Sequence, residues 1–368
     1  MQGVSLDVSC GRTQLFPGME TELRYKVQNE KSLPLIWMEL SQNASERACV
    51  EPDETFERYT YQCNEETGKS IMREAYRRRF SFVMGYETLE LTSRWTAVRR
   101  GLYRPKELML RSGDGFGLTQ VEQVAPIEKV PELVVYPKRV AVDISMFLHS
   151  DWERSAGSVG FTEDMSILRG LRPYQTTDGW KRINWRMAAK NAGELKSNFY
   201  ETIQPSSVLF VLDGESFCGK DRELEETLEV LGSVISELFE RGVFCGLCLP
   251  VSKRFFAVSL PPVAERSSAE LLYYLAGYEC AERYLTNAEG VKTGKHLPAD
   301  FDIPAVMESA LESGMIAVVT CDPDEIPVKL MRQMERHVVR VFSAGKTECT
   351  DTEQKVLPLS CLRKGERA

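Results

Sequence analysis

Two uninterrupted apolar runs, each ending in an aspartate, constrain the fold of this chain more than any other feature. The runs are SSVLFVLD at residues 206–213 and GMIAVVTCD at residues 314–322. Strands that lack the alternation of apolar and polar residues are typical of parallel sheets covered on both faces. Residues 222–241, after the first run, carry leucines at helical spacing. Strands and amphipathic helices in alternation predict an α/β domain of the Rossmann type, with a mainly parallel sheet, over residues 206–368.

The first 136 residues follow a different pattern. Short segments of alternating apolar residues, among them TELRYKVQNE and TLELTSRW, are separated by turn-forming residues such as Pro17 and Gly18. Short strands at this spacing, without a long amphipathic helix, predict a β-sandwich of the immunoglobulin or fibronectin kind. A chain of 368 residues is long enough for two or three domains. We therefore expect a sandwich over residues 1–136 and a separate α/β domain from residue 206.

A connector with its own charge character joins the two predicted domains at residues 137–205. Its central part, residues 165–200, holds seven basic and two acidic side chains, a local charge of +5 in a chain of net charge −8. Asp178 precedes WKRINWRMAAKN and suits the N-cap of a helix. One interpretation is that Trp180 and Trp185 dock this helix on the acidic body, with its arginines paired internally. The other is that the basic side chains bind an anionic partner.

Composition and spacing exclude several classes of protein. No charge-free stretch exceeds 11 residues, whereas a membrane-spanning helix needs about 20 apolar residues, and the first residues do not resemble a signal peptide. The net negative charge gives no reason to expect nucleic acid as a partner. Ten dispersed cysteines and three distant histidines indicate reduced core thiols and no zinc site. Because the sequence also lacks a nucleophile elbow and a phosphate-binding loop, we expect a soluble chain that is not an enzyme.

Three motifs, in the same order along the chain, resemble the bacterial domain-of-unknown-function family 58. Residues 99–118, RRGLYRPKELMLRSGDGFGL, are similar to the family's R-R-G-x-Y run followed by D-x-F-G-L, and VVYPK at 134–138 is similar to its next strand. Residues 168–201 are similar to the central signature, although Thr177 and Lys190 replace the usual glycine and arginine. The signature positions in this sequence are Arg172, Tyr174, Asp178, Arg182, Ile183, Trp185, Arg186 and Lys190.

This resemblance implies an architecture and a partner. Family members usually carry N-terminal membrane helices, a β-domain, the signature segment and a von Willebrand factor A-like domain, and they commonly occur alongside MoxR-type AAA+ ATPases. We therefore expect the α/β domain to be von Willebrand factor A-like. We also expect the full-length protein to be membrane-associated and cytoplasmic-facing, through an N-terminal anchor missing from this chain.

The resemblance also implies an acidic site at the carboxyl edge of the predicted sheet. In a von Willebrand factor A-like domain, an Asp-x-Ser-x-Ser run, a threonine and a third-loop aspartate hold a metal ion. Asp213 and Asp322 match the two acids, whereas Glu215 and Phe217 stand in place of the serines and no threonine lies in the loop at 259–268. The residues predict either a degenerate metal-ion-dependent adhesion site or a weak Mg²⁺ site, with the candidate ligands Asp213, Glu215, Ser216 and Asp322.

Three functions remain open at this point. The leading hypothesis is a non-enzymatic protein-interaction module that works with a MoxR-type AAA+ ATPase. A metal-dependent hydrolase using Asp213, Glu215 and Asp322 is the second hypothesis. An anion-binding module, facing lipid headgroups or nucleic acid, is the third, and its basic side chains would be Arg172, Lys181, Arg182 and Arg186. Every hypothesis that uses the acidic site requires Asp213 and Asp322 to lie close together.

Overall fold

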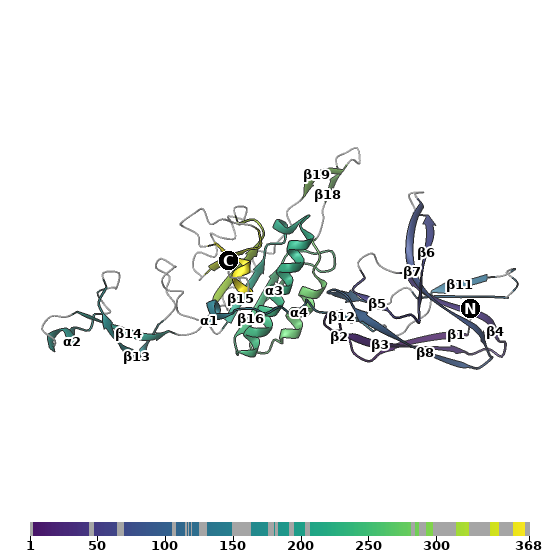
Figure 1. Cartoon of the computed structure of the whole chain (residues 1–368), viewed down its shortest axis with the longest axis horizontal. Coiled ribbons are helices and arrows are strands. Elements are labelled where there is room, and N and C mark those ends of the chain that lie inside the picture. Colours follow the sequence, from purple (N-terminus) through teal and green to yellow (C-terminus); the bar gives the residue numbers. More distant parts are fainter. Residues whose placement is uncertain are drawn as a thin grey trace. The chain divides into compact units, whose positions relative to one another are not determined.

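A computed structural model gives the fold of most of the chain (Figure 1). The described residues are 3–43, 48–64, 70–104, 108–114, 116, 118, 120–124, 131–148, 163–175, 180, 183–190, 195–202, 207–280, 284–286, 292–296, 314–323, 339–345 and 356–364. The chain divides into two compact units. Unit 1 consists of Met1–Val140, Leu231–Ser233 and Ala269–Glu279, and unit 2 consists of Ala141–Val230, Val234–Ser268 and Cys280–Ala368. The two late segments that belong to unit 1 are not foreseen by the sequence.

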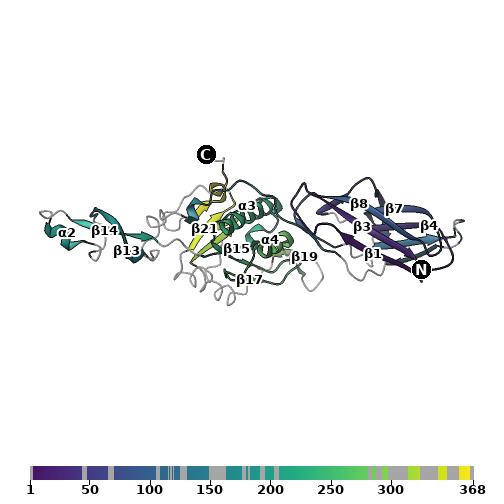
Figure 2. The ribbon, with the colours of Figure 1, turned by 90° about the horizontal axis from the view of Figure 1, so that it is seen from below.

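Unit 1 contains the β-sandwich predicted for the first part of the chain. Its first sheet has the antiparallel order β1 (Val4–Cys10), β3 (Glu20–Asn29), β8 (Thr88–Ala97), β5 (Val50–Pro52). Its second sheet has the antiparallel order β11 (Gln120–Val124), β10 (Leu108–Gly113), β4 (Leu35–Asn43), β7 (Ser70–Val83), β6 (Glu57–Asn64). A small third sheet joins β2 (Gln14–Leu15), β12 (Leu133–Val135) and β9 (Gly101–Tyr103). Figure 2 shows the long strands of the two main sheets running side by side.

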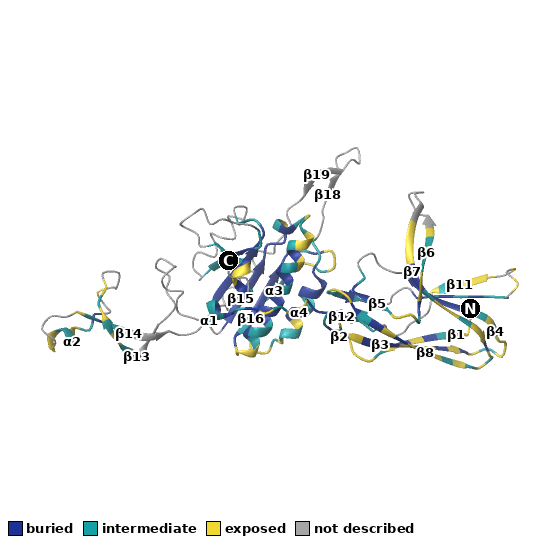
Figure 3. Ribbon diagram, in the orientation of Figure 1, coloured by how far each residue is buried: buried dark blue, intermediate teal, exposed yellow. Residues whose placement is uncertain are grey.

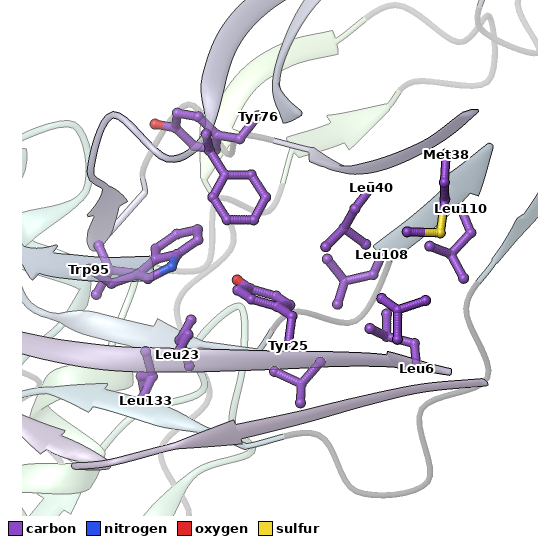
Figure 4. Close-up of a cluster of buried hydrophobic side chains, with 14 of the residues drawn as sticks. Leu6, Leu23, Tyr25, Met38, Leu40, Tyr76, Trp95, Leu108, Leu110 and Leu133 are labelled. Carbon is purple, nitrogen blue, oxygen red and sulfur yellow. The ribbon is translucent and has the colours of Figure 1, made fainter. Parts of the chain in front are cut away.

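The sandwich core follows directly from the alternation in its strands. Along β3, exposed and buried residues alternate without a break, so one face of the strand supplies the core. Trp95 is fully buried, and its ring centroid lies 6.0 Å from that of Phe56, 6.1 Å from that of Tyr76 and 5.4 Å from that of Tyr103. Figure 4 shows Trp95 and Tyr25 among the leucines that come from both sheets. Each large side chain buried in this way contributes about 1.5–3 kcal/mol to stability.

Unit 2 is built on a six-stranded, mainly parallel sheet. The strand order is β17 (Val258–Leu260), β16 (Phe244–Leu249), β15 (Ser207–Leu212), β20 (Met315–Thr320), β21 (Val339–Ser343), β22 (Val356–Pro358). Only β17 runs antiparallel to its neighbour. Every residue of β15 and β20 is buried, as the two apolar runs predict, and Figure 3 shows β15 in dark blue.

Helices form where the sequence has helical periodicity. Helix α3 (Asp221–Glu240) follows β15 and buries its leucine face, and α4 (Ser268–Gly277) falls mainly in unit 1. A short helix, α1 (Ser145–Leu148), and two 3₁₀ turns, η3 (Glu215–Phe217) and η5 (Leu359–Leu362), complete the described helical elements. No helix in the described part of the chain is long and apolar enough to cross a membrane. Residues 303–312 and 325–336, whose sequences also predict helices, lie outside the described residues.

The basic connector forms a hairpin with a short helix at its end. Strand β13 (Glu163–Pro173) pairs with β14 (Lys196–Thr202), and α2 (Trp185–Lys190) lies between them in the chain. A second hairpin joins β18 (Tyr284–Thr286) and β19 (Lys292–His296). The helix begins later than the sequence predicts, because Ile183 makes a β-bridge with Ser197 and Oδ1 of Asn184 accepts from the amide of Met187 at 3.1 Å. Asn184 is therefore the N-cap, and the predicted cap, Asp178, lies outside the described residues.

Candidate functional site at the carboxyl edge of the parallel sheet

Asp213 and Asp322 lie at the edge of the unit 2 sheet where β15 and β20 end. The two strands are parallel neighbours, in register through Leu212 and Val319, and the amide of Asp213 donates to the carbonyl of Val319 at 2.8 Å. The chain passes from β15 to β16 on one side, whereas β20 lies on the other side of β15. Strand order therefore reverses between β15 and β20. In open α/β sheets, ligands collect outside the carboxyl ends of the strands at such a switch point.

Thr320 connects the two aspartates. Its hydroxyl Oγ1 donates to Oδ2 of Asp213 at 2.8 Å, and the amide of Asp322 donates to the same Oγ1 at 3.1 Å. Thr320 is fully buried and Asp213 is only 4% exposed. The sequence analysis expects a threonine hydroxyl from the loop at 259–268 and does not identify Thr320. The available signal was a threonine that ends an otherwise apolar strand, two positions before the predicted acid.

Ser216 holds the two loops together from the other side. Its Oγ donates to the backbone carbonyl of Asp213 at 2.8 Å and accepts from the backbone amide of Cys321 at 2.8 Å. Both bonds are part-buried, so breaking them would leave backbone groups without partners away from water. Ser216 therefore acts as a clamp between the β15 loop and the β20 loop.

Burial dominates the electrostatics of Asp213. Desolvation raises the pKa of its carboxyl above the ordinary value, because the charged form is poorly solvated at this depth. Hydrogen bonds from Thr320 and Ser216 act in the opposite direction and limit the rise. Thr320, which donates to its Oδ2 at 2.8 Å, is a neutral hydroxyl rather than a cation. A charged carboxyl group at this buried position lowers the stability of the fold.

The donor set does not fit the expected Mg²⁺ ion. Oδ2 of Asp213 accepts from Thr320, and the hydroxyl of Ser216 is bonded on both sides. Glu215 is exposed, and Phe217, which stands in place of the second serine, is fully buried in the core. Among the residues that the structure describes, no group of three or more His, Cys, Asp or Glu side chains is placed to hold a metal ion. Asp213 and Ser216 are thus bonded to neighbouring groups of the protein, and this arrangement does not suit a cation.

Three thiols and one ammonium group also lie around these loops, and the sequence did not single them out. Nζ of Lys220 donates to Sγ of Cys321 at 3.3 Å. Cys280 and Cys218 both donate to the carbonyl of Gly214, at 3.5 and 3.9 Å. All three cysteines are unpaired by disulfides. Because cysteines are ordinarily core residues, spacing alone could not place these three beside the acidic loops.

The signature residues lie on the β13–β14 hairpin and α2, away from the acidic loops in the chain. Ile183 is buried, and Nδ2 of Asn184 donates to Oδ1 of Asn198 at 2.8 Å, so these residues fasten α2 to β14. The expected docking through tryptophans is wrong, since Trp180 is 75% exposed and Trp185 is 57% exposed. Large apolar rings are ordinarily buried against the body of a protein, but no described element buries these two tryptophan rings.

The remaining signature positions divide into two groups. Arg172 is half-buried on β13, and the amide of Tyr174 donates to the carbonyl of Leu195 at 3.0 Å. Arg186 and Lys190 are exposed on α2. Asp178 and Arg182 of the signature lie outside the described residues, as does Lys181 of the predicted anion-binding set.

The upstream motif has a structural role within unit 1. Nη1 of Arg100 donates to the carbonyls of Leu275, Ala276 and Tyr278 at 3.0, 3.1 and 2.7 Å, which caps the carboxyl end of α4. A Cβ atom at Gly101 would lie 2.8 Å from Cβ of Cys49, so only glycine fits there. These contacts explain an Arg-Gly pair at this point of the sequence without a binding role.

Comparisons with known proteins give likenesses of shape only. No family model matches the chain, and no curated protein matches it. Among solved structures, the CARDB domain of the PF1109 protein from Pyrococcus furiosus is 12% identical, with a TM-score of 0.21, over 36% of this chain and 86% of that chain. A cohesin module from a Clostridium perfringens family 33 glycoside hydrolase is 12% identical, with a TM-score of 0.23, over 37% and 98%. A type II cohesin domain from Acetivibrio cellulolyticus is 7% identical, with a TM-score of 0.17, over 35% and 94%.

Proposed function

We propose that this chain is a non-enzymatic protein-interaction module whose α/β domain is of the von Willebrand factor A type. The observation that carries the proposal is the internal use of Asp213, Ser216 and Thr320, whose oxygens hold the β15 and β20 loops together. A loop pair braced in this way forms a rigid rim that a partner can contact without first ordering it. The rim stands at the switch point of the sheet, where ligands of such folds collect.

The hydrolase alternative needs the same groups for another purpose. A general base must reach the proton that it removes, either directly or through one water. The carboxyl of Asp213 is 4% exposed and already accepts from Thr320, so its position supports bracing rather than proton transfer. The geometry of Asp213 therefore favours an interaction module.

The partner class comes from the family resemblance alone. Motifs at residues 99–118, 134–138 and 168–201 support an accessory protein of a MoxR-type AAA+ ATPase. In this proposal the protein is membrane-associated and faces the cytoplasm, and the rim presents Glu215 and Asp322 to the ATPase.

The direct test is a binding measurement with the MoxR-type ATPase encoded by the same genome. Glu215→Arg and Asp322→Arg reverse the charge of the rim, and we expect each to weaken binding at least about 10-fold, since like charges across an interface cost several kcal/mol. Glu240→Arg is the matched control, because Glu240 is exposed at the far end of α3 and a cation suits a helix C-terminus. Equal affinities for all three variants and the parent would reject the rim as the contact surface.

A second candidate function has one specific observation in its favour. The exposed Trp180, Trp185, Arg186 and Lys190 form an amphipathic, basic tip on the hairpin, which suits an anionic surface. Sedimentation with phosphatidylglycerol vesicles in 50 and 200 mM salt tests it. Trp185→Ser with Arg186→Ser should abolish salt-sensitive sedimentation, whereas vesicle binding that survives both changes would remove this candidate.

A further inference from the structure

The outer face of the second sandwich sheet buries a glutamate. Sheet faces turned to solvent are ordinarily polar and exposed, yet Glu39 on β4 is only 4% exposed. A buried carboxylate is costly unless cations and hydrogen bonds compensate it. Here Nε of Arg79 donates to Oε2 of Glu39 at 2.7 Å, and Nη1 of Arg111 lies 3.6 Å from Oε1. Strand pairing places Arg79 on β7 and Arg111 on β10 directly opposite Glu39.

Glu39 forms the floor of a cavity of about 380 Å³ on this face. Its lining carries three arginines and one glutamate, a net charge of +2 in a chain of net charge −8. A tryptophan and a glutamine amide complete it. We call this site the arginine pocket, and its lining residues are Trp37, Glu39, Arg77, Arg79, Arg111 and Gln120.

Internal partners orient the three guanidinium groups but do not use all of their N–H donors. Arg77 donates through Nε to Oε2 of Glu57 at 2.9 Å and lies over the Tyr59 ring at 4.6 Å. Arg111 donates through Nη2 to Glu122 at 2.9 Å, and its buried Nε has no partner among the described residues. Each guanidinium has five N–H donors, so the pocket keeps donors available for a further anion. Arginines held in this way are suited to bidentate recognition of carboxylate or phosphate.

A loop beside the arginine pocket holds two large apolar side chains in solvent. Gly113 pairs with Trp37 on one side and Gln120 on the other, and the loop that follows Gly113 carries Phe116 and Leu118. Phe116 is 86% exposed and Leu118 is 84% exposed. This loop is part of the D-x-F-G-L motif.

The side chain of Asp114 holds the amides of these two residues. Oδ1 of Asp114 accepts from the amides of Phe116 and Leu118 at 3.0 and 3.2 Å. Bonds of this Asx-turn kind leave both apolar side chains uncovered. Two apolar anchors are therefore presented next to a cationic pocket.

We infer that the arginine pocket and the exposed side chains of Phe116 and Leu118 together form a docking site for an acidic, apolar-containing peptide segment of a protein partner. Carboxylates of the segment would bind the outward N–H groups of Arg79 and Arg77, and its apolar residues would cover Phe116 and Leu118. The pairing of cationic and apolar features on neighbouring strands favours a peptide over a small anion, because a small anion cannot reach both. The inference rests on the proposed function in naming a partner, but it concerns a different surface.

Fluorescence anisotropy with a labelled twelve-residue peptide tests this site. The peptide alternates glutamate with leucine and phenylalanine, and a matched peptide has glutamine at every glutamate. We expect the parent to prefer the acidic peptide at least about 10-fold, because hydrogen bonds to charged groups are the stronger ones. Arg79→Gln should remove that preference, and Phe116→Ser with Leu118→Ser should weaken both peptides. Arg24→Gln, on the opposite sheet and also exposed, should bind like the parent.

Several outcomes would overturn the inference. Equal binding of both peptides would do so, and so would unchanged binding by Arg79→Gln. Complete competition by inorganic phosphate at about 5 mM would also do so, because it would mean that a free anion occupies the pocket. Binding of phosphatidylglycerol vesicles that depends on Arg79 would instead assign the pocket to a lipid surface. A far-ultraviolet circular dichroism melt of each variant shows that loss of binding is not loss of fold. Asp322→Arg, measured with the same peptide, should bind normally, so failure at the rim and failure at the arginine pocket are distinguishable.

Discussion

The two units each bury a carboxylate, and they stabilise it by different means. In the sandwich, Glu39 lies between the guanidinium groups of Arg79 and Arg111. In the α/β unit, Asp213 has a neutral hydroxyl partner, Thr320, and burial raises its pKa. Removing the cations beside Glu39 would leave a buried charge unpaired, whereas Asp213 already keeps its charge beside neutral partners. The difference predicts opposite responses when each carboxylate or its partners are changed.

The largest effect is expected when Glu39 loses both cations. Arg79→Ala combined with Arg111→Ala leaves a buried carboxylate unpaired, which costs about 3–5 kcal/mol when a pair is fully buried. Because the Arg79 side chain is 62% exposed, we expect the lower end, about 3 kcal/mol, in the free energy of unfolding from urea denaturation. Arg24→Ala combined with Arg94→Ala, two exposed arginines of the other sheet, is the control and should cost less than about 1 kcal/mol. A parental urea midpoint for the Arg79 and Arg111 double variant would mean that these cations do not hold Glu39.

A smaller loss is expected from Thr320→Val. The substitution keeps the shape of the side chain but removes the donor to Asp213, so a buried acceptor is left without its partner at a cost of about 1–3 kcal/mol. Urea denaturation measures the loss. Thr320→Ser should recover most of it, and Thr92→Val, at an exposed position of β8, should leave stability unchanged. If serine fails to rescue, packing of the threonine methyl is responsible.

Asp213→Asn should raise stability at neutral pH, in contrast to any change at Glu39. Asparagine can accept the bond from Thr320 without a buried charge. The folded-state pKa of Asp213 lies above its unfolded value, so the stabilisation present below the unfolded pKa is lost as pH rises through the folded pKa. We expect the variant to melt about 2 °C higher than the parent at pH 7, with the gap closing towards pH 4. Thermal melts from pH 4 to pH 7 measure it, and a gap independent of pH would contradict the electrostatic explanation.

The smallest effect on stability is expected at the exposed loop of the sandwich. Phe116→Ser and Leu118→Ser remove side chains that are 86% and 84% exposed, so each should change the free energy of unfolding by less than about 0.5 kcal/mol. The melting temperature of each variant is the measurement, with Trp95→Ala as the destabilised reference, at a cost of about 3–5 kcal/mol. A large loss at Phe116 or Leu118 would mean that the loop is part of the core rather than a docking surface.

Sequence patterns predicted the elements of the site better than its contacts. The apolar runs identified β15 and β20, and the aspartates that end them both reach the carboxyl edge of the sheet. The position of Thr320 against Asp213 depends on the register between two strands that are far apart in the chain, since the two residues are separated by 107 positions. A run of apolar residues carries no register, because any alignment buries it equally well.

The same division applies to the whole chain. By itself, the sequence determined the alternating strands of the sandwich, the buried parallel strands and the leucine face of α3, because each depends on local periodicity that the sequence displays directly. Only the tertiary structure decided that Glu39 is buried, since period-two alternation places it on the outer face of β4 with other polar residues. Its burial arises from Arg79, 40 residues away, and from Arg111, which topology brings to the two neighbouring strands. The packing of the whole domain determines which strands are neighbours in a sheet. The arginine pocket therefore depends on the pairing of three strands, none of which indicates it by its own sequence.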